Sequence, residues 1–165
     1  MTMTVKTKIF IHGLESSSQG VKGRFFQQRF PDMIVPDFID PLEERMAKLK
    51  SILGDKDKII IVGSSYGGLM GTIFTMENEE RVEKLILLAP AINYLNMALE
   101  KLGVKEKIIK IPTHIYHGKK DDVIPLQEVR PVADKIFENL SFNVVDDDHY
   151  LHETFFNIPW ELLLK

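Results

Sequence analysis

Several features that mark specialised classes of protein are missing from this sequence of 165 residues. It has no cysteine, which excludes disulfide bonds, thiolate metal sites and a cysteine nucleophile. Its 21 basic and 24 acidic side chains nearly balance, so its charge favours neither nucleic acid nor an anionic membrane surface as a partner. No apolar run reaches the ~20 residues of a membrane-spanning helix, and the run near the amino terminus is too short for a signal peptide. We therefore expect a soluble, cytoplasmic protein.

Glycine motifs that bind nucleotides are missing as well. No Gly-x-Gly-x-x-Gly motif follows the first expected strand, and there is no Gly-Lys-Ser or Gly-Lys-Thr loop. A nucleotide- or flavin-binding module is therefore an alternative with little support, and we expect no cofactor. The sequence does not indicate an oligomeric state.

What the chain does contain is an alternation of short apolar strands with helices. This order is typical of a parallel sheet that helices cover on both faces. Because no linker-like or low-complexity stretch interrupts it, we expect residues 1–165 to form a single α/β domain with a six-stranded, mainly parallel sheet. The expected strands are 8–12, 33–35, 59–62, 85–88, 112–117 and 141–145, and the expected helices are 21–30, 41–53, 69–76, 94–102 and 126–138.

The most informative segment surrounds Ser65. Four β-branched residues, Ile59–Val62, run into Gly63-Ser64-Ser65-Tyr66-Gly67, and an apolar helix follows. In this context Gly-x-Ser-x-Gly is the nucleophile-elbow motif, whose glycines let strand and helix backbones pass closely while the strained turn exposes the serine hydroxyl. We predict that Ser65 is a catalytic nucleophile. Its neighbour Ser64 is expected to pack or to cap the helix.

A serine hydroxyl needs a base to take its proton and an acid to orient that base. Asp121 and Asp122 follow one expected strand, and His149 follows the last one, with His152 a helical turn further on. Because the carboxyl ends of parallel strands meet at one edge of a sheet, these loops should lie near the serine. Loop spacing favours Asp121 over Asp122, and placement directly after the strand favours His149 over His152.

The oxyanion that forms during acyl transfer needs backbone N–H donors. The residue after the nucleophile, Tyr66, supplies one at the amino terminus of a helix. The loop after the first strand supplies the other, since His12-Gly13 places the amide of Leu14 there. These two amides are the predicted oxyanion hole.

The acidic run 146–148, with His149, His152 and Glu153 after it, invites comparison with metal sites. It matches neither the H-E-x-x-H pattern of zinc proteases nor the spacing of a calcium-binding EF-hand loop. We interpret it as a solvated acidic loop that carries one catalytic histidine, and we expect no metal.

With these segments in order, the sequence resembles the α/β-hydrolase family over essentially its whole length. The family's acid loop usually reads His-Gly-x-x-Asp-x-x-Val-Pro, which maps the triad acid onto Asp121, and its base maps onto His149. The opening 12–22 is similar to that of small lidless esterases of the YqiA type, and Lys22 fits that pattern, although it also suits a surface charge. The matching segments are IHG at 11–13, GSSYG at 63–67, HGKKDDVIP at 117–125 and DHYLHE at 148–153.

The resemblance implies a minimal α/β-hydrolase fold without a cap. Larger members insert a helical cap after the strand that ends here before Pro90, but the stretch 91–111 is too short for one. We therefore expect a shallow, open pocket that suits short acyl chains. The candidate walls are Leu14, Tyr66, Ile92, Tyr94, Val123 and Tyr150.

The resemblance also implies a function. We expect a serine hydrolase that cleaves small carboxylic esters or thioesters through an acyl-enzyme with a Ser65-His149-Asp121 triad, without metal or cofactor. Its partner would be a small-molecule ester or thioester. A catalytically silent hydrolase fold that serves protein interaction is the other alternative, because the fold by itself does not specify activity.

Overall fold

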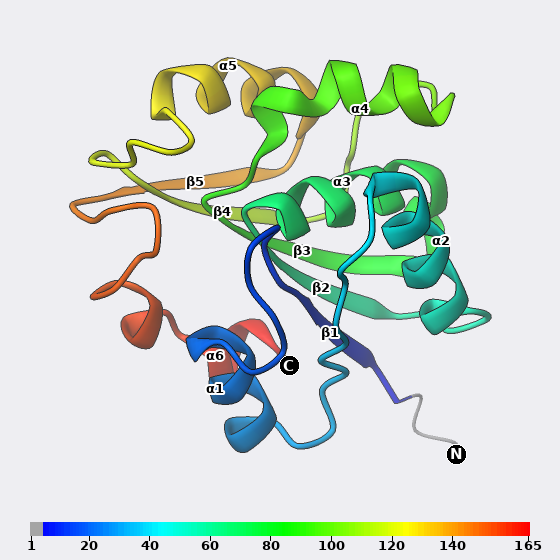
Figure 1. Ribbon diagram of the computed structural model, residues 1–165, viewed down its shortest axis with the longest axis horizontal. Helices are drawn as coiled ribbons and strands as arrows, with labels where there is room; N and C mark the ends of the chain where they lie inside the picture. Colours follow the sequence, from blue (N-terminus) through cyan, green and yellow to red (C-terminus); the bar gives the residue numbers. More distant parts are fainter. Residues whose placement is uncertain (1–4) are drawn as a thin grey trace.

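A parallel sheet runs through the middle of the computed structural model, which describes residues 5–165 (Figure 1). Its five strands lie in the spatial order β1-β2-β3-β4-β5, and every neighbouring pair is parallel. The prediction of a parallel sheet in an α/β fold is thus confirmed, although the number of strands differs. The strands are β1 (Thr7–Ile11), β2 (Ile59–Ser64), β3 (Val82–Leu88), β4 (Thr113–Gly118) and β5 (Leu140–Val145). The first four residues of the amino-terminal segment lie outside the described part of the chain.

The prediction of a sixth strand at 33–35 is wrong. Only Ile34 pairs with β1: its N–H donates to the Lys8 carbonyl, and its own carbonyl accepts from Phe10, both at 2.9 Å. The next residue in register to donate to β1 is Pro36, which has no N–H. The pairing therefore remains a single bridge at the edge of the sheet.

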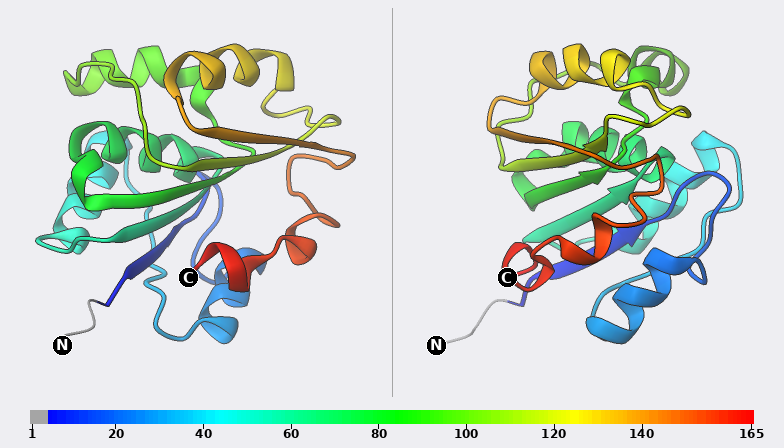
Figure 2. Two further views of the ribbon diagram at one scale, coloured as in Figure 1. Left: turned by 180° about the vertical axis from the view of Figure 1, so that it is seen from behind. Right: turned by 90° about the vertical axis from the view of Figure 1, so that its left-hand side faces the viewer.

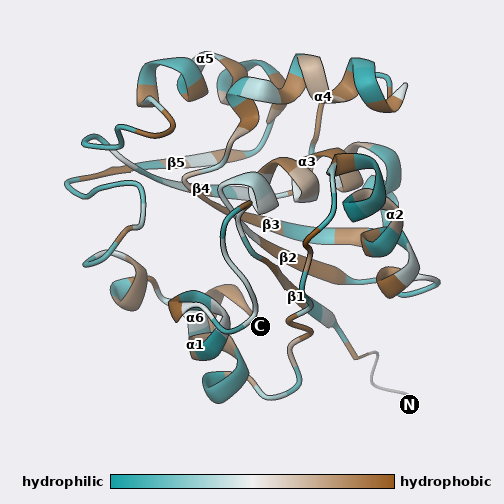
Figure 3. Ribbon diagram, in the orientation of Figure 1, coloured by the Kyte–Doolittle hydropathy of each residue, from teal (hydrophilic) through white to brown (hydrophobic). Residues whose placement is uncertain are grey.

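Two groups of helices cover the two faces of the sheet (Figures 1 and 2). Successive side chains of a strand point to opposite faces, so Ile61 joins one hydrophobic core and Ile60 the other. Figure 3 shows the hydrophobic colouring along β2 and the carboxyl half of β3, which are buried on both faces. One face carries α2 (Leu42–Leu53), α3 (Tyr66–Asn78), α4 (Leu95–Leu102) and α5 (Leu126–Ile136), and the other carries α1 (Val21–Arg29) and α6 (Trp160–Leu163).

The segment between β3 and β4 leaves the carboxyl edge of the sheet accessible. It holds the short 3-10 helix η2 (Ile92–Tyr94) and α4, which pack against the α3 and α5 side of the core. Within residues 5–165 no separate cap is inserted at this point. Across the same residues, every helix is too short or too polar to span a lipid bilayer.

Candidate active site

Ser65 occupies the sharp turn between β2 and α3. Its backbone has φ 53° and ψ −114°, a strained conformation that residues other than glycine seldom adopt. The turn is held from both sides, because the Ser65 N–H donates to the Leu88 carbonyl at 2.8 Å and its own carbonyl accepts from Ala91 at 2.9 Å. These two hydrogen bonds hold Ser65 in its strained conformation at the carboxyl edge of the sheet.

The two glycines of the motif are required by close backbone contacts. A Cβ atom on Gly63 would lie 2.5 Å from the Gly67 carbonyl oxygen, and one on Gly67 would lie 2.0 Å from the Ile11 carbonyl oxygen. Both distances are shorter than any contact that a real side chain makes, and the atoms met belong to backbone that cannot move aside. Gly-x-Ser-x-Gly thus has a steric explanation in this turn, as the sequence interpretation supposed.

Asp121 and His149 form a buried hydrogen-bonded pair. Nδ1 of His149 donates to Oδ2 of Asp121 at 2.8 Å, and the side chain of Asp121 is fully buried. Oδ1 of Asp121 accepts from the amides of Val123 at 2.9 Å and Ile124 at 2.7 Å, so each carboxylate oxygen has a donor. Burial raises the pKa of Asp121, but the hydrogen bonds from His149 and the Ile124 amide outweigh it and lower that pKa overall. The carboxylate is therefore ionised near neutral pH.

The buried His117 also contacts this pair. Its Nε2 lies 2.8 Å from the Ile124 carbonyl oxygen, which can only accept, so Nε2 carries the proton. The same nitrogen is 3.4 Å from Oδ2 of Asp121. Burial lowers the pKa of His117, the Ile124 carbonyl opposing the shift, and the ring is consequently neutral. His149 is the histidine that both contacts Asp121 and lines the cavity.

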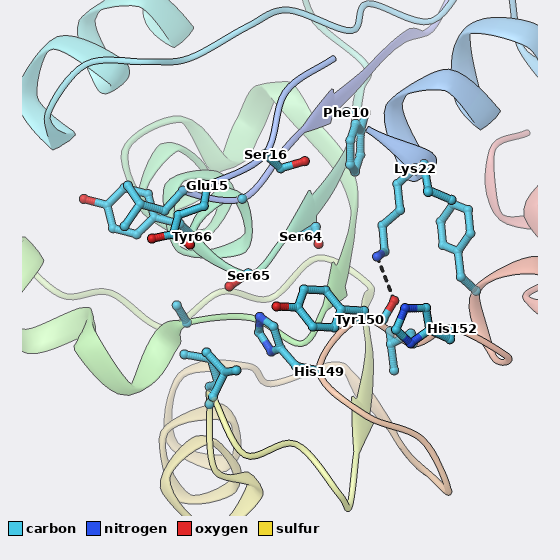
Figure 4. Close-up of a pocket in the computed structure, with 18 of the residues that line it drawn as sticks. Phe10, Glu15, Ser16, Lys22, Ser64, Ser65, Tyr66, His149, Tyr150 and His152 are labelled. Atoms are coloured by element: carbon cyan, nitrogen blue, oxygen red, sulfur yellow. Dashed lines mark hydrogen bonds between the residues drawn. The ribbon is translucent and has the colours of Figure 1, made fainter. Parts of the chain in front are cut away.

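Ser65 and His149 face each other in one cavity (Figure 4). Nδ1 of His149 is used by Asp121, so its Nε2 is the nitrogen available on the side of the serine. Among the described residues no hydrogen bond joins the Ser65 hydroxyl to His149. In ligand-free enzymes such bonds are often long and shorten only when a substrate binds.

The predicted oxyanion loop lies directly beside Ser65. A Cβ atom on Gly13 would be 3.5 Å from Cβ of Ser65, which is ordinary van der Waals contact. Within residues 5–165 neither the amide of Leu14 nor that of Tyr66 has a hydrogen-bond acceptor. Nδ1 of His12 donates to the Gly13 carbonyl at 2.6 Å, while its Nε2 accepts from the Phe38 amide. Because the carbonyl and N–H of one trans peptide point in opposite directions, this bond also orients the Leu14 amide.

Arg45 is a residue of this region that the sequence interpretation missed. It lies on the buried face of α2, where it donates to the Leu14 carbonyl at 3.3 Å and to the Asp40 carbonyl. Its guanidinium also stacks over the ring of Tyr66, 5.4 Å from the centroid. One buried arginine thus contacts both residues whose amides form the predicted oxyanion hole. The signal was an arginine on a helix face otherwise made of leucine and methionine.

The cavity around Ser65 has a volume of about 580 Å³, within the range of small-molecule sites. Of the predicted walls, Leu14, Tyr66, Tyr94, Val123 and Tyr150 line it. Ile92 does not, because its side chain is 0% exposed and packs in the core beside α3. A second wall was missed, on the side of α1 and the 3-10 helix η3 (Phe155–Asn157), and it makes the cavity larger than the shallow pocket expected. Its members are Phe10, Val21, Lys22, Phe155 and Phe156.

The acidic loop that carries His149 is organised by Asp147. Its Oδ1 accepts from the Asp148 amide at 2.8 Å, and its Oδ2 accepts from the amides of Glu153 at 3.1 Å and Thr154 at 2.8 Å. Burial raises the pKa of Asp147, but these backbone donors prevail and lower it to about 2. Within residues 5–165 no three His, Asp or Glu side chains converge as a metal ion would need. Asp147 therefore has a structural role as the ionised centre of the loop.

Replacing Asp147 with asparagine should make the free energy of unfolding depend less on pH. A pKa lowered on folding adds stability at pH values above that of the unfolded carboxyl, about 4, and the gain is lost as pH falls towards 2. We expect Asp147→Asn to lower the free energy of unfolding by about 2 kcal/mol at pH 7 and by much less at pH 2. Urea unfolding at both pH values measures the difference.

Asp146→Asn is the matched control for that experiment. Asp146 is exposed, and among the described residues its ion pairs are with Lys119 and Lys120 on the surface, so its loss should change stability far less than the loss of Asp147. An Asp147→Asn variant with the same deficit at pH 7 and pH 2 would contradict the assignment of an ionised Asp147.

Comparison with known proteins agrees with the fold. A family model described as alpha/beta hydrolase fold matches residues 13–104, which is more than half of the chain. A comparison with curated protein sequences gave no significant match.

Solved structures match over nearly the whole chain at low sequence identity, and such likeness shows the fold alone. Est1E from Butyrivibrio proteoclasticus, solved with ferulic acid bound, has a TM-score of 0.74 at 15% identity, covering 96% of this chain and 86% of its own. A YdeN-like hydrolase from Pectobacterium atrosepticum has a TM-score of 0.72 at 17% identity, with the same two coverages. A monoacylglycerol lipase from Paleococcus ferrophilus has a TM-score of 0.70 at 14% identity, covering 95% and 93%.

Proposed function

The chain belongs to the alpha/beta hydrolase fold family, and from this premise we propose that it is a serine hydrolase that cleaves carboxylic esters or thioesters of small acyl substrates. The observation that carries the proposal is that His149, hydrogen-bonded to Asp121, faces Ser65 across one cavity. Structural neighbours described as an esterase and a lipase agree with ester chemistry, although fold alone does not determine the reaction.

In the proposed mechanism, Ser65 attacks the carbonyl carbon of the substrate. Nε2 of His149 accepts the hydroxyl proton, and Asp121 stabilises the imidazolium that results through the 2.8 Å bond to Nδ1. The amides of Leu14 and Tyr66 bind the oxyanion of the tetrahedral intermediate. His149 then donates the proton to the leaving alcohol or thiol, and an acyl-enzyme on Ser65 remains.

Water completes the cycle. It attacks the acyl-enzyme while Nε2 of His149 removes its proton, and the Ser65 hydroxyl is restored as the carboxylic acid leaves. Each step uses side chains and amides already present around the cavity. The glycines of the turn keep Ser65 in its strained, exposed position throughout, so that no rearrangement of the backbone is needed.

Covalent labelling tests the proposal directly. A fluorophosphonate probe should react with the purified protein at Ser65, identified by mass spectrometry of the labelled peptide, and p-nitrophenyl acetate or butyrate should be hydrolysed. Heat-denatured protein is the control, since an activated serine requires the folded site. Absence of both labelling and ester hydrolysis in folded protein would point instead to a catalytically silent hydrolase fold.

A further inference from the structure

The wall of the cavity formed by α1 and η3 differs in character from the oxyanion side. Four apolar side chains line it, of which Val21 and Phe156 are exposed and Phe10 and Phe155 are almost fully buried. Among the described residues that line the cavity, Lys22 is the one lysine or arginine, and it extends from α1 towards the loop of His149 and Tyr150, as Figure 4 shows. A substrate that fills this half of the cavity must therefore combine an apolar body with a group that can lie next to a positive charge.

The ammonium of Lys22 is only partly satisfied. One of its three N–H bonds goes to the Tyr150 carbonyl at 2.8 Å, and its charge lies 5.5 Å from the centroid of the Phe155 ring. Among residues 5–165 no carboxylate lies within 4.0 Å of it. Burial lowers the pKa of Lys22, and its half-buried ammonium has no carboxylate in contact with it among the described residues.

The nearby acidic groups do not fill this role. Asp148 and Asp147 raise the pKa of Lys22 from a distance. Oδ2 of Asp148 is bonded to Nδ1 of His152 at 2.7 Å, and both carboxylate oxygens of Asp147 accept from backbone amides. Glu15 also lines the cavity, but it lies on the exposed loop after β1 and is not within ion-pair distance of Lys22. Two N–H bonds of Lys22 remain for a ligand, in the same cavity as Ser65.

We propose that Lys22 binds a carboxylate of the substrate, so that the preferred substrates are esters carrying a free carboxylate on an apolar spacer. The inference rests on the proposed esterase function and narrows its substrate class. Pairing with a substrate carboxylate supplies the counter-ion that Lys22 lacks, and the aromatic wall accommodates the spacer. A neutral ester of the same length supplies no counter-ion to the ammonium, so it should be the poorer substrate.

Two pairs of esters test this specificity. The acyl side is probed by mono-p-nitrophenyl glutarate against p-nitrophenyl pentanoate, and the alcohol side by 4-acetoxybenzoate against its methyl ester. In at least one pair the carboxylate should raise kcat/KM of the unaltered protein by about 10- to 100-fold, the effect of one charge-assisted hydrogen bond.

Three variants separate recognition from structure. Lys22→Met keeps an apolar side chain at this position but removes the charge, so kcat/KM should fall by about 10- to 100-fold for the carboxylate ester and should not fall for the neutral ester. Lys22→Arg keeps the charge and should retain most of the preference. Arg24→Gln removes an exposed cation from the same helix and should leave both esters unaffected.

The outcomes are distinguishable. Hydrolysis of neutral esters with no preference for the carboxylate in either pair overturns the inference and leaves the proposed function intact. Equal losses on both esters in Lys22→Met also overturn it, because Lys22 would then only hold the loop of Tyr150 and His149. If no ester is hydrolysed and the fluorophosphonate probe does not react, the proposed function fails and the inference falls with it.

Discussion

Replacing Ser65 with alanine should lower kcat/KM for ester hydrolysis by about 10⁴-fold or more while the protein stays folded. The alanine removes the only atom that can form the acyl-enzyme and leaves the backbone contacts of the turn in place. Stability should change by no more than about 1 kcal/mol, since the hydroxyl makes no hydrogen bond within the described residues. Hydrolysis of p-nitrophenyl butyrate, fluorophosphonate labelling and thermal unfolding measure the three effects.

Ser64→Ala is the matched control for Ser65→Ala. Ser64 ends β2 next to the elbow and lines the same cavity, but its backbone has no positive φ. Its replacement should leave at least about a tenth of the activity, as expected for a residue that does not form the covalent intermediate. Full activity in Ser65→Ala, or loss of labelling in Ser64→Ala instead, would refute the assignment of the nucleophile.

Replacing Asp121 with asparagine should lower kcat by about 10⁴-fold with little loss of fold. The asparagine oxygen can still accept from the amides of Val123 and Ile124, which places its NH₂ group against Nδ1 of His149. Nδ1 must then act as the acceptor, and the proton of the neutral ring moves to Nε2. In that tautomer His149 cannot take the proton of Ser65, so the base is lost although every residue remains in position.

The neighbouring Asp122 provides the control. It is exposed on the same loop, so Asp122→Asn should change kcat by less than about threefold. Steady-state kinetics on one ester, together with near-UV circular dichroism to verify packing, compares the two variants. An Asp121→Asn protein that kept more than a tenth of its activity would exclude Asp121 as the orienting acid.

Local physics made part of this protein predictable from its sequence. Residues 59–62 form a fully buried strand because four β-branched side chains suit a sheet covered on both faces. The elbow at Ser65 was predictable because a turn this tight admits only glycine at positions 63 and 67. The error at 33–35 also has a local cause, since Pro36 stops the ladder after one bridge.

Contacts between distant segments were decided by the tertiary structure alone. Spacing favoured Asp121 and His149 over their neighbours, but only the fold joins these two side chains, 28 residues apart, and pairs His152 with Asp148 instead. Ile92 was expected in the pocket and lies in the core. Only the packing of α1 beside the loop of Tyr150 places Lys22 at the cavity.

The physical reason for this division is the range of the interactions involved. Strand burial, turn sterics and the order of loops along a parallel sheet depend on residues close in sequence, so the elbow and the place of its partners could be inferred from the chain itself. The surroundings of a charged side chain depend on which distant segment covers it, because burial and counter-ions, not residue type, determine its state. Arg45 beside Leu14 and Tyr66, and Lys22 in the aromatic wall, therefore acquire their proposed roles only in the folded protein.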